Sequence, residues 1–195
     1  MTNRKKLESF LASCDREELL REFNESWLNG LFPGLDLLES CDQGTAAHLE
    51  GNVANHTALV FENLISLAPH RLGREADFIE RLSVILHDWK KPETRSPLPN
   101  GFVAFPGHEE LAAVEVPKIS QFLNLRDSEH EKLLYLVAEH GKAHSWGRLP
   151  AEEQGRIRSS PWIKSLALLQ EADAKSCILP GQSHLPVNWD LLVLN

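Results

Sequence analysis

Apolar residues recur every three to four positions along most of the sequence, and this spacing constrains the fold more than any other feature. Between positions 55 and 67, for example, Val60, Leu64 and Leu67 fall on one helical face. Alternating apolar and polar residues, which would indicate strands, are scarce. Because a period near 3.6 is typical of amphipathic helices, we predict an all-α fold of about six or seven helices.

Capping residues and helix breakers set the limits of these helices. Proline disrupts a helix interior but suits its first turn, so Pro117 predicts a kink or break and Pro161 predicts a start. Asp127 or Ser128 is suited to cap a helix that stops at Gly141. The predicted helices cover residues 16–31, 55–67, 74–89, 109–123, about 128–141 and 161–175.

Two segments are predicted to be irregular. Residues 90–107, KKPETRSPLPNGFVAFPG, hold four prolines and two glycines and are expected to form a long loop. Arg95 within it is a candidate to close over a substrate, although a solvated arginine is the simpler interpretation. Residues 179–195 are proline-rich and then apolar. We expect them to pack back on the body of the protein.

Length and composition narrow the protein class. The 195 residues suit a single domain spanning residues 1–195, and the net charge of −8 argues against binding long nucleic acid. No run of eighteen apolar residues is present, and the amino-terminal segment is too polar for a signal-peptide core. We therefore expect a cytoplasmic protein without membrane association. Three separated cysteines, Cys14, Cys41 and Cys177, predict free thiols.

Several histidine and aspartate residues occur where the helical pattern calls for apolar ones. His56 shares a face with Val60 and Leu64, because residues four apart lie on one side of a helix. Three later helices carry His87 with Asp88, His140, and Asp173 in the same way. An unpaired buried carboxylate costs several kcal/mol. A divalent cation would compensate for it, since carboxylate oxygen and neutral imidazole nitrogen are its ligands.

A simpler interpretation exists for each residue alone. A single histidine on an apolar face is more often a hydrogen-bonded core residue than a ligand. His108, in the segment FPGHEE, could ligate a metal, cap the following helix or lie on the surface. The metal hypothesis therefore rests on the whole set.

The order His56, His87-Asp88 and Asp173 resembles the H…HD…D signature of the HD superfamily of metal-dependent phosphohydrolases. The blocks HLEGNVANHT, ILHDWKKPET and FPGHEELAA are similar to the HD domain attached to bacterial CCA-adding tRNA nucleotidyltransferases. The resemblance spans about residues 46–113 and 166–174 and implies an HD-domain-like helical bundle. No segment resembles the nucleotidyltransferase domain, so CCA addition is not expected.

The resemblance implies roles for particular residues. His56, His87, Asp88 and Asp173 would bind one divalent metal, with Asp88 also taking part in catalysis. Two-metal relatives, the HD-GYP phosphodiesterases, have two further histidines, which implies a second metal or a phosphate at His108 and His140.

The segments that resemble the family contain one further matching residue and depart from the family pattern at two positions. Lys91 resembles the family lysine near the substrate phosphate and is the second expected catalytic residue. HDWKKP stands where the family usually reads HDIGKP, so Lys90 replaces a glycine, and Asn52 stands where the family has aspartate.

These residues predict metal-assisted hydrolysis of a phosphoester. The resemblance implies a small phosphorylated substrate, such as a 2′,3′-cyclic phosphate, a nucleoside monophosphate or an RNA end. One or two ions of Mn, Ni, Co, Fe, Zn or Mg fit mixed His/Asp ligation, with histidine disfavouring Mg. The alternatives are a non-catalytic HD module that binds a nucleotide or protein with a structural metal, and a plain helical adaptor.

Overall fold

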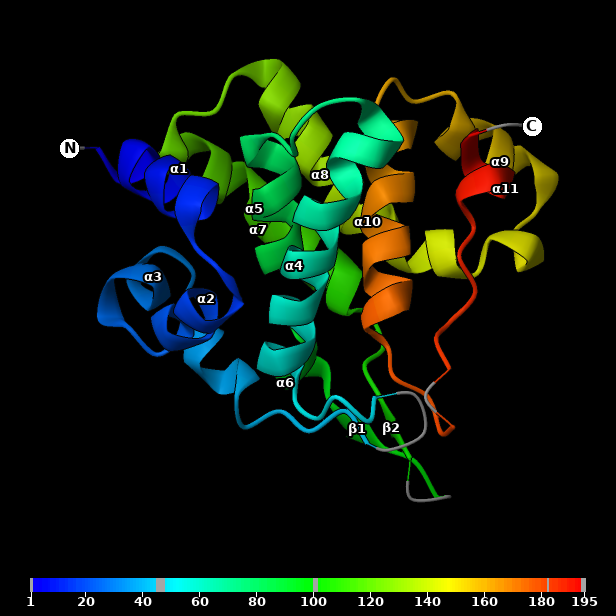
Figure 1. Cartoon of the computed structure of the whole chain (residues 1–195), viewed down its shortest axis with the longest axis horizontal. Helices are drawn as coiled ribbons and strands as arrows, with labels where there is room; N and C mark the ends of the chain where they lie inside the picture. The colour runs from blue at the N-terminus through cyan, green and yellow to red at the C-terminus, as the bar shows by residue number, and fades with distance from the viewer. Residues whose placement is uncertain (1, 45–47, 100–101, 182, 194–195) are drawn as a thin grey trace.

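Helices form most of the described chain, which confirms the all-α prediction (Figure 1). The computed structural model describes residues 2–44, 48–99, 102–181 and 183–193. The helices of ten or more residues in these ranges are α1 (Asn3–Ser13), α4 (Val53–Leu72), α5 (Phe78–His87), α7 (His108–Leu123), α8 (Asp127–His144) and α10 (Ile163–Ser176). Five of these six correspond to predicted helices, whereas α1 was not predicted, and shorter elements connect them.

The shorter elements lie between and around the long helices. They are α2 (Arg16–Phe23), α3 (Ser26–Leu31), η1 (Leu35–Leu38), α6 (Lys91–Thr94), η2 (Trp146–Arg148), α9 (Ala151–Arg158) and α11 (Trp189–Val193). A hairpin of two short antiparallel strands, β1 (Ser96–Pro97) and β2 (Val103–Ala104), pairs Ser96 with Ala104. Figure 1 shows this hairpin at one end of the bundle.

The core lies between α4 and α10 and extends to α8, which also packs on α5 and α7. Apolar side chains from these helices are fully buried, among them Phe61, Leu64, Leu82, Leu136 and Leu168. Burying a side chain of this size contributes about 1.5–3 kcal/mol. The apolar faces predicted from the sequence therefore meet one another and fix the directions of the helices.

Local hydrogen bonds decide where the central helices begin. The Asn52 side chain accepts the backbone N–H of Asn55 at 2.9 Å, so α4 begins at Val53. Asp77 and Glu80 cap α5 reciprocally, which is why this helix begins at Phe78 and not at the predicted residue 74. Two signals that were overlooked in the sequence, an Asn cap and a capping box, thus set both boundaries.

Several other boundaries also differ from the predictions. The segment 16–31 forms two helices, because the backbone N–H of Asn24 bonds to the Arg21 carbonyl and closes α2. Helix α7 continues through Pro117 without a break. Neither Asp127 nor Ser128 caps α8, since Glu129 accepts the Arg126 backbone N–H instead.

Gly141 was predicted to end a helix, but α8 continues to His144. A Cβ atom added at position 141 would collide with the carboxylate of Glu109 on α7. The glycine therefore permits close contact between two helices.

The predicted loop over residues 90–107 contains more regular structure than expected. Helix α6 forms one turn, with Pro92 at its start, and the β hairpin follows. Residues 100 and 101 lie outside the described residues. The Arg95 side chain is exposed and donates to the Asp42 carbonyl at 3.2 Å, so the expected role over a substrate stays a prediction.

The carboxyl-terminal segment packs on the body, as predicted for its described part. Trp189 and Leu192 of α11 are buried, while residues 182, 194 and 195 lie outside the described ranges. The three cysteines are buried free thiols. Within the described residues no helix combines the length and apolar character needed to span a bilayer.

Candidate metal centre

Polar residues from five helices meet in one group. Each of them lies near a helix end that faces this point. His56 lies in the first turn of α4, His87 ends α5, His108 begins α7, His140 lies one turn before the end of α8, and Asp173 is near the end of α10. The structure therefore gathers residues that are 117 positions apart in sequence, from 56 to 173.

Asp88 lies at the centre of this group, and its two carboxylate oxygens face different partners. Oδ2 lies 3.2 Å from His87 Nε2 and 3.5 Å from His56 Nε2. Oδ1 lies 3.2 Å from His108 Nε2 and 3.8 Å from His140 Nε2. Two compact sets of ligand atoms thus share one aspartate, and each set fits within 4.8 Å.

The Nδ1 atoms of three histidines are fixed by the backbone. Nδ1 of His87, His108 and His140 lies 2.8 Å from the carbonyl oxygen three residues earlier in each case. A carbonyl oxygen only accepts hydrogen bonds, so Nδ1 must carry the proton. In the neutral ring Nε2 then holds a lone pair, and it points at Asp88. This is the tautomer of a metal-binding histidine.

His56 is fixed in the same sense by Glu50. Its Nδ1 lies 3.0 Å from Glu50 Oε1, and its Nε2 faces Asp88 and Asp173. Burial raises the pKa of Glu50, but hydrogen bonds from His48 and His56 outweigh it and lower the pKa to about 2. The ionised carboxylate accepts the Nδ1 proton and leaves Nε2 free to ligate.

The short distances around Asp88 include several that are not hydrogen bonds. Nε2 of His56, His87 and His108 are buried atoms without a hydrogen-bond partner. The Lys91 ammonium pairs with Asp88 Oδ2 but reaches none of these nitrogens. Lone pairs of neutral imidazoles and of a carboxylate repel one another unless a positive charge lies between them. The residues present therefore fit a divalent cation, and their donor set of imidazole nitrogen and carboxylate oxygen suits a transition metal.

Asp173 joins the group through pairwise contacts. Its Oδ1 lies 3.0 Å from His56 Nε2, and its Oδ2 lies 2.7 Å from His144 Nε2. The two compact sets around Asp88 do not include Asp173. The structure thus brings His56, His87 and Asp88 closely together and places Asp173 beside His56.

The electrostatics keep both aspartates ionised. Burial raises the pKa of Asp88, but His87 and Lys91 outweigh it and hold that pKa well below its usual range. For Asp173 burial acts in the same direction, and His144 and His56 lower its pKa strongly. An ionised carboxylate is the form that ligates a metal.

The pKa values of His140 and His56 shift in opposite directions, although both imidazoles are buried. Burial lowers the pKa of His140, and contact with Asp88 does not restore it. Burial also opposes the charge on His56, but the carboxylates of Asp173 and Glu50 raise its pKa to about 9. Without a metal this ring therefore carries a second proton on Nε2, and a bound cation would take the place of that proton.

Lys91 lies beside Asp88 at the start of α6. Its Nζ is 2.7 Å from Asp88 Oδ2 and donates to Gln43 Oε1 at 2.7 Å. Burial lowers the pKa of Lys91, but Asp88 outweighs burial and raises it, so the ammonium stays charged. The positive charge predicted from the sequence thus lies within reach of any anion bound at Asp88.

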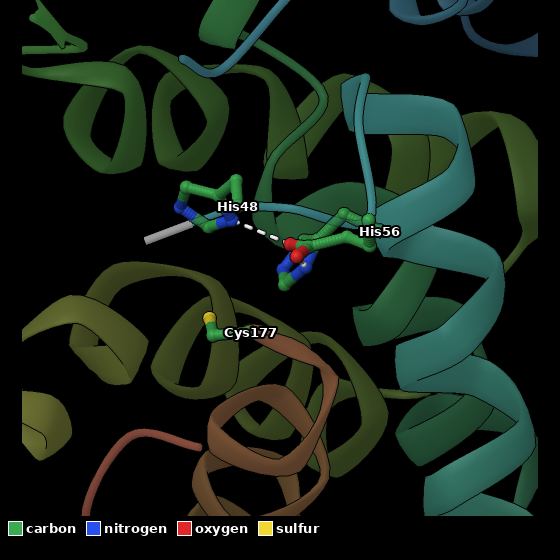
Figure 2. Close-up of side chains that lie close together, drawn as sticks. His48, His56 and Cys177 are labelled. Atoms are coloured by element: carbon green, nitrogen blue, oxygen red, sulfur yellow. Dashed lines mark hydrogen bonds and ion pairs between the residues drawn. The ribbon is translucent and has the colours of Figure 1, made fainter. Parts of the chain in front are cut away.

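A second cluster lies behind His56 and involves residues that the sequence analysis did not assign. Figure 2 shows His48, His56 and Cys177 gathered there, and with Glu50 their ligand atoms lie within 4.8 Å. Glu50 Oε1 contacts Nδ1 of both histidines, and its Oε2 accepts the Ile178 N–H at 2.9 Å. Because Glu50 is satisfied by the chain itself, we interpret this cluster as support for His56.

A pocket of about 140 Å³ reaches the centre from the surface. Its walls include Asp88, Lys91, His108, His140 and Asp173, and also His48 and His144. His108 is therefore part of the centre. It does not cap α7, because Gly107 holds the cap position.

Sequence reasoning missed His48, Glu50 and His144. His144 follows His140 by four positions on α8 and could have been found from that spacing. His48 and Glu50 fall in the segment HLEGN before α4, where no periodicity points inwards. Only the fold places that segment against α4 and the end of α10.

Comparisons with known proteins do not identify the chain. No protein-family model matches it, and a search of curated protein sequences finds no significant match.

Proposed function

We propose that this chain is a metal-dependent phosphohydrolase of the HD type, which cleaves a phosphoester of a nucleotide or of an RNA end. One observation carries the proposal. Four buried imidazoles have Nδ1 held by an acceptor and turn Nε2 towards the single carboxylate of Asp88. This arrangement is costly without a cation and is suited to holding one.

The ligands divide between the two oxygens of Asp88. His56 and His87 face Oδ2, and Asp173 adds an oxygen beside His56. His108 and His140 face Oδ1 and would hold a second cation or a phosphoryl oxygen. A divalent cation supplies Lewis acidity there, which lowers the pKa of water towards neutrality and polarises a phosphoryl oxygen.

Lys91 is the residue that we expect to meet the substrate charge. Its ammonium lines the pocket and stays charged beside Asp88. Negative charge increases on the phosphoryl oxygens during hydrolysis, and a fixed cation in a partly dry pocket stabilises it. Lys91 would therefore bind and orient the phosphoryl group while Asp88 orients the attacking water.

The substrate class follows from the pocket and from the resemblance stated above. A pocket of about 140 Å³ accepts a phosphoryl group but not a polymer. The net charge of −8 gives no attraction for a long nucleic-acid backbone. We therefore propose 2′,3′-cyclic phosphates, nucleoside monophosphates or an RNA terminus as substrates.

The test is hydrolysis of 2′,3′-cyclic nucleotides, nucleoside monophosphates and bis-p-nitrophenyl phosphate with added Mn²⁺, Ni²⁺, Co²⁺ or Mg²⁺. The wild type is compared with Asp88→Asn, which keeps the side-chain shape, and with Asp36→Asn, an exposed aspartate, as the matched control. We expect metal-dependent turnover in the wild type and the control, and none in Asp88→Asn. Metal binding without turnover of any ester would favour the non-catalytic module.

A further inference from the structure

A hollow of about 450 Å³ adjoins the metal-centre pocket. The two share His144 and Leu185 as lining residues, so they lie side by side. The hollow lies between the end of α8 with η2 on one side and residues 185–191 on the other. Its remaining walls include Ser145, Arg148, Pro186 and Leu191.

The sizes of the two spaces indicate that they would hold different parts of one substrate. Sites for organic ligands usually measure roughly 300–1,000 Å³. The pocket at Asp88, at about 140 Å³, is too small for a nucleotide, whereas the adjoining hollow is large enough for the organic part. A phosphoester whose phosphoryl group reaches Asp88 would extend past His144 into this hollow.

The walls of the hollow suit a flat, partly polar group. Leu185, Pro186 and Leu191 supply apolar surface, and Leu191 is 44% exposed. The Arg148 side chain is exposed, and its guanidinium donates to Ser145 Oγ at 3.2 Å. Nucleobases stack on guanidinium planes and apolar side chains, and they hydrogen-bond at their edges.

The charge of the hollow argues against a second phosphate. Among the described residues that line it, Arg148 is the only lysine or arginine. Phosphate groups in proteins are usually held by several donors or cations together. A nucleoside needs one stacking surface and a few polar contacts, and this hollow offers both.

The wall formed by residues 185–191 is held in place by the chain. The Asn188 side chain donates to the Ala143 carbonyl at 2.8 Å, and its backbone N–H donates to Gln170 Oε1 at 2.9 Å. The Leu185 N–H donates to the Ala174 carbonyl at 3.2 Å. The hollow is therefore formed before a ligand arrives, which reduces the entropic cost of binding.

We propose that this hollow is the subsite for the nucleoside part of the substrate, with Arg148 stacking on the base and Leu185, Pro186 and Leu191 forming its apolar bed. The proposal rests on the proposed function, because the phosphoryl group must bind at Asp88. It adds a specificity determinant on η2 and the carboxyl-terminal segment.

Equilibrium binding tests the subsite separately from turnover. The metal-loaded full chain is titrated with adenosine 3′-monophosphate and with methyl phosphate in a calorimeter. We expect the nucleotide to bind roughly tenfold more tightly or better, and Arg148→Ala and Leu191→Asp each to weaken it roughly tenfold. Methyl phosphate should bind these variants within about twofold of the wild type, since it does not reach the hollow.

Arg21→Ala is the matched control, because Arg21 is exposed on α2 at the opposite side of the molecule (Figure 1). Equal affinities of the two ligands for the wild type, no nucleotide binding, or a loss that both ligands share would overturn the proposal. Selective nucleotide binding that depends on Arg148 and Leu191, without turnover of any ester, would support the subsite and contradict the phosphohydrolase function.

Discussion

Helix α5 has a buried carboxylate at each end, and the two are compensated in different ways. Near its start, Glu80 accepts hydrogen bonds at 2.7–2.9 Å from Arg74, Lys132 and Ser165. Just beyond its end, Asp88 faces four imidazole Nε2 atoms and one lysine. The first carboxylate is neutralised by cations of the chain, and the second is surrounded mainly by ligand atoms.

The difference shows what distinguishes a structural ion pair from a candidate metal centre. Both sites bury charge, so burial alone does not identify function. Neither oxygen of Glu80 is a buried atom without a hydrogen-bond partner, whereas three Nε2 atoms that face Asp88 are, even though Lys91 pairs with Asp88 Oδ2. Unsatisfied ligand atoms that converge on one point, with their opposite ring nitrogens held, are the feature that indicates a cation.

The largest expected effect is a difference in metal affinity between variants at the two ends of α5. In Asp88→Asn we expect the Kd for Mn²⁺ to rise by about 100-fold or more, because loss of outer hydrogen-bond partners alone costs roughly 10- to 100-fold. In Glu80→Gln the Kd should change by less than about threefold, since Glu80 touches no ligand. Calorimetric titration of both variants measures this, and equal losses in the two would break the comparison.

The second prediction concerns the free energy of unfolding of Glu80→Gln relative to the wild type. A chelator is present in both measurements, so that no bound metal contributes to stability. The cations around Glu80 lower its pKa from 4.5 to about 2 despite burial, which corresponds to about 3 kcal/mol of stability at neutral pH. Glu80→Gln should lose about this much, as measured by urea unfolding at pH 7. A loss below about 1 kcal/mol would mean that the ion pairs contribute little.

The pH dependence of that loss has a definite sign. A carboxyl with a lowered pKa in the folded state contributes fully above pH 4.5, and its contribution disappears as the pH falls towards 2. The difference between wild type and Glu80→Gln should therefore shrink through this range. Unfolding curves at pH 6, 4 and 3 test it, and a difference that does not change with pH would contradict the assignment.

The third prediction sharpens the contrast by testing the support of one ligand. Glu50→Gln keeps the side-chain shape but weakens the hold on the His56 Nδ1 proton, so metal affinity should fall roughly tenfold. His48→Ala, which removes the other histidine on Glu50, should change it by less than about threefold. Equal losses of metal affinity in the two variants would contradict this prediction. They would mean that His48 and Glu50 together hold His56 in place.

Of the two buried carboxylates of α5, the sequence indicated the importance of Asp88 but not that of Glu80. An adjacent His-Asp pair on an apolar face is a rare pattern, and it directed attention to His87 and Asp88. Glu80 was not noticed, because a glutamate in a first turn is also typical of an ordinary exposed helix start. Its partner Lys132 lies 52 positions later on α8, and only the packing of α8 on α5 brings the two together.

Helix boundaries, and residues that contact the histidine ligands from outside the site, were harder to predict for a similar reason. Helical periodicity identified five of the six long helices, because one apolar face must be buried in each, but it did not identify α1. It did not show that Gly141 lies inside α8, because the Glu109 carboxylate that lies against this glycine belongs to α7. Contacts between elements decided this, just as they decided the role of Glu50.

The smallest expected effect concerns Gly141, beside His140 at the metal end of the molecule. Alanine favours the helix by about 1 kcal/mol relative to glycine, but its Cβ would displace the Glu109 carboxylate. That carboxylate is the partly exposed end of a flexible side chain, so it can turn towards water at small cost. We expect Gly141→Ala to change the free energy of unfolding by less than about 1 kcal/mol and the Kd for Mn²⁺ by less than about threefold. A larger loss of affinity would show that packing between α7 and α8, and not only the orientation of the imidazoles, maintains the centre around Asp88.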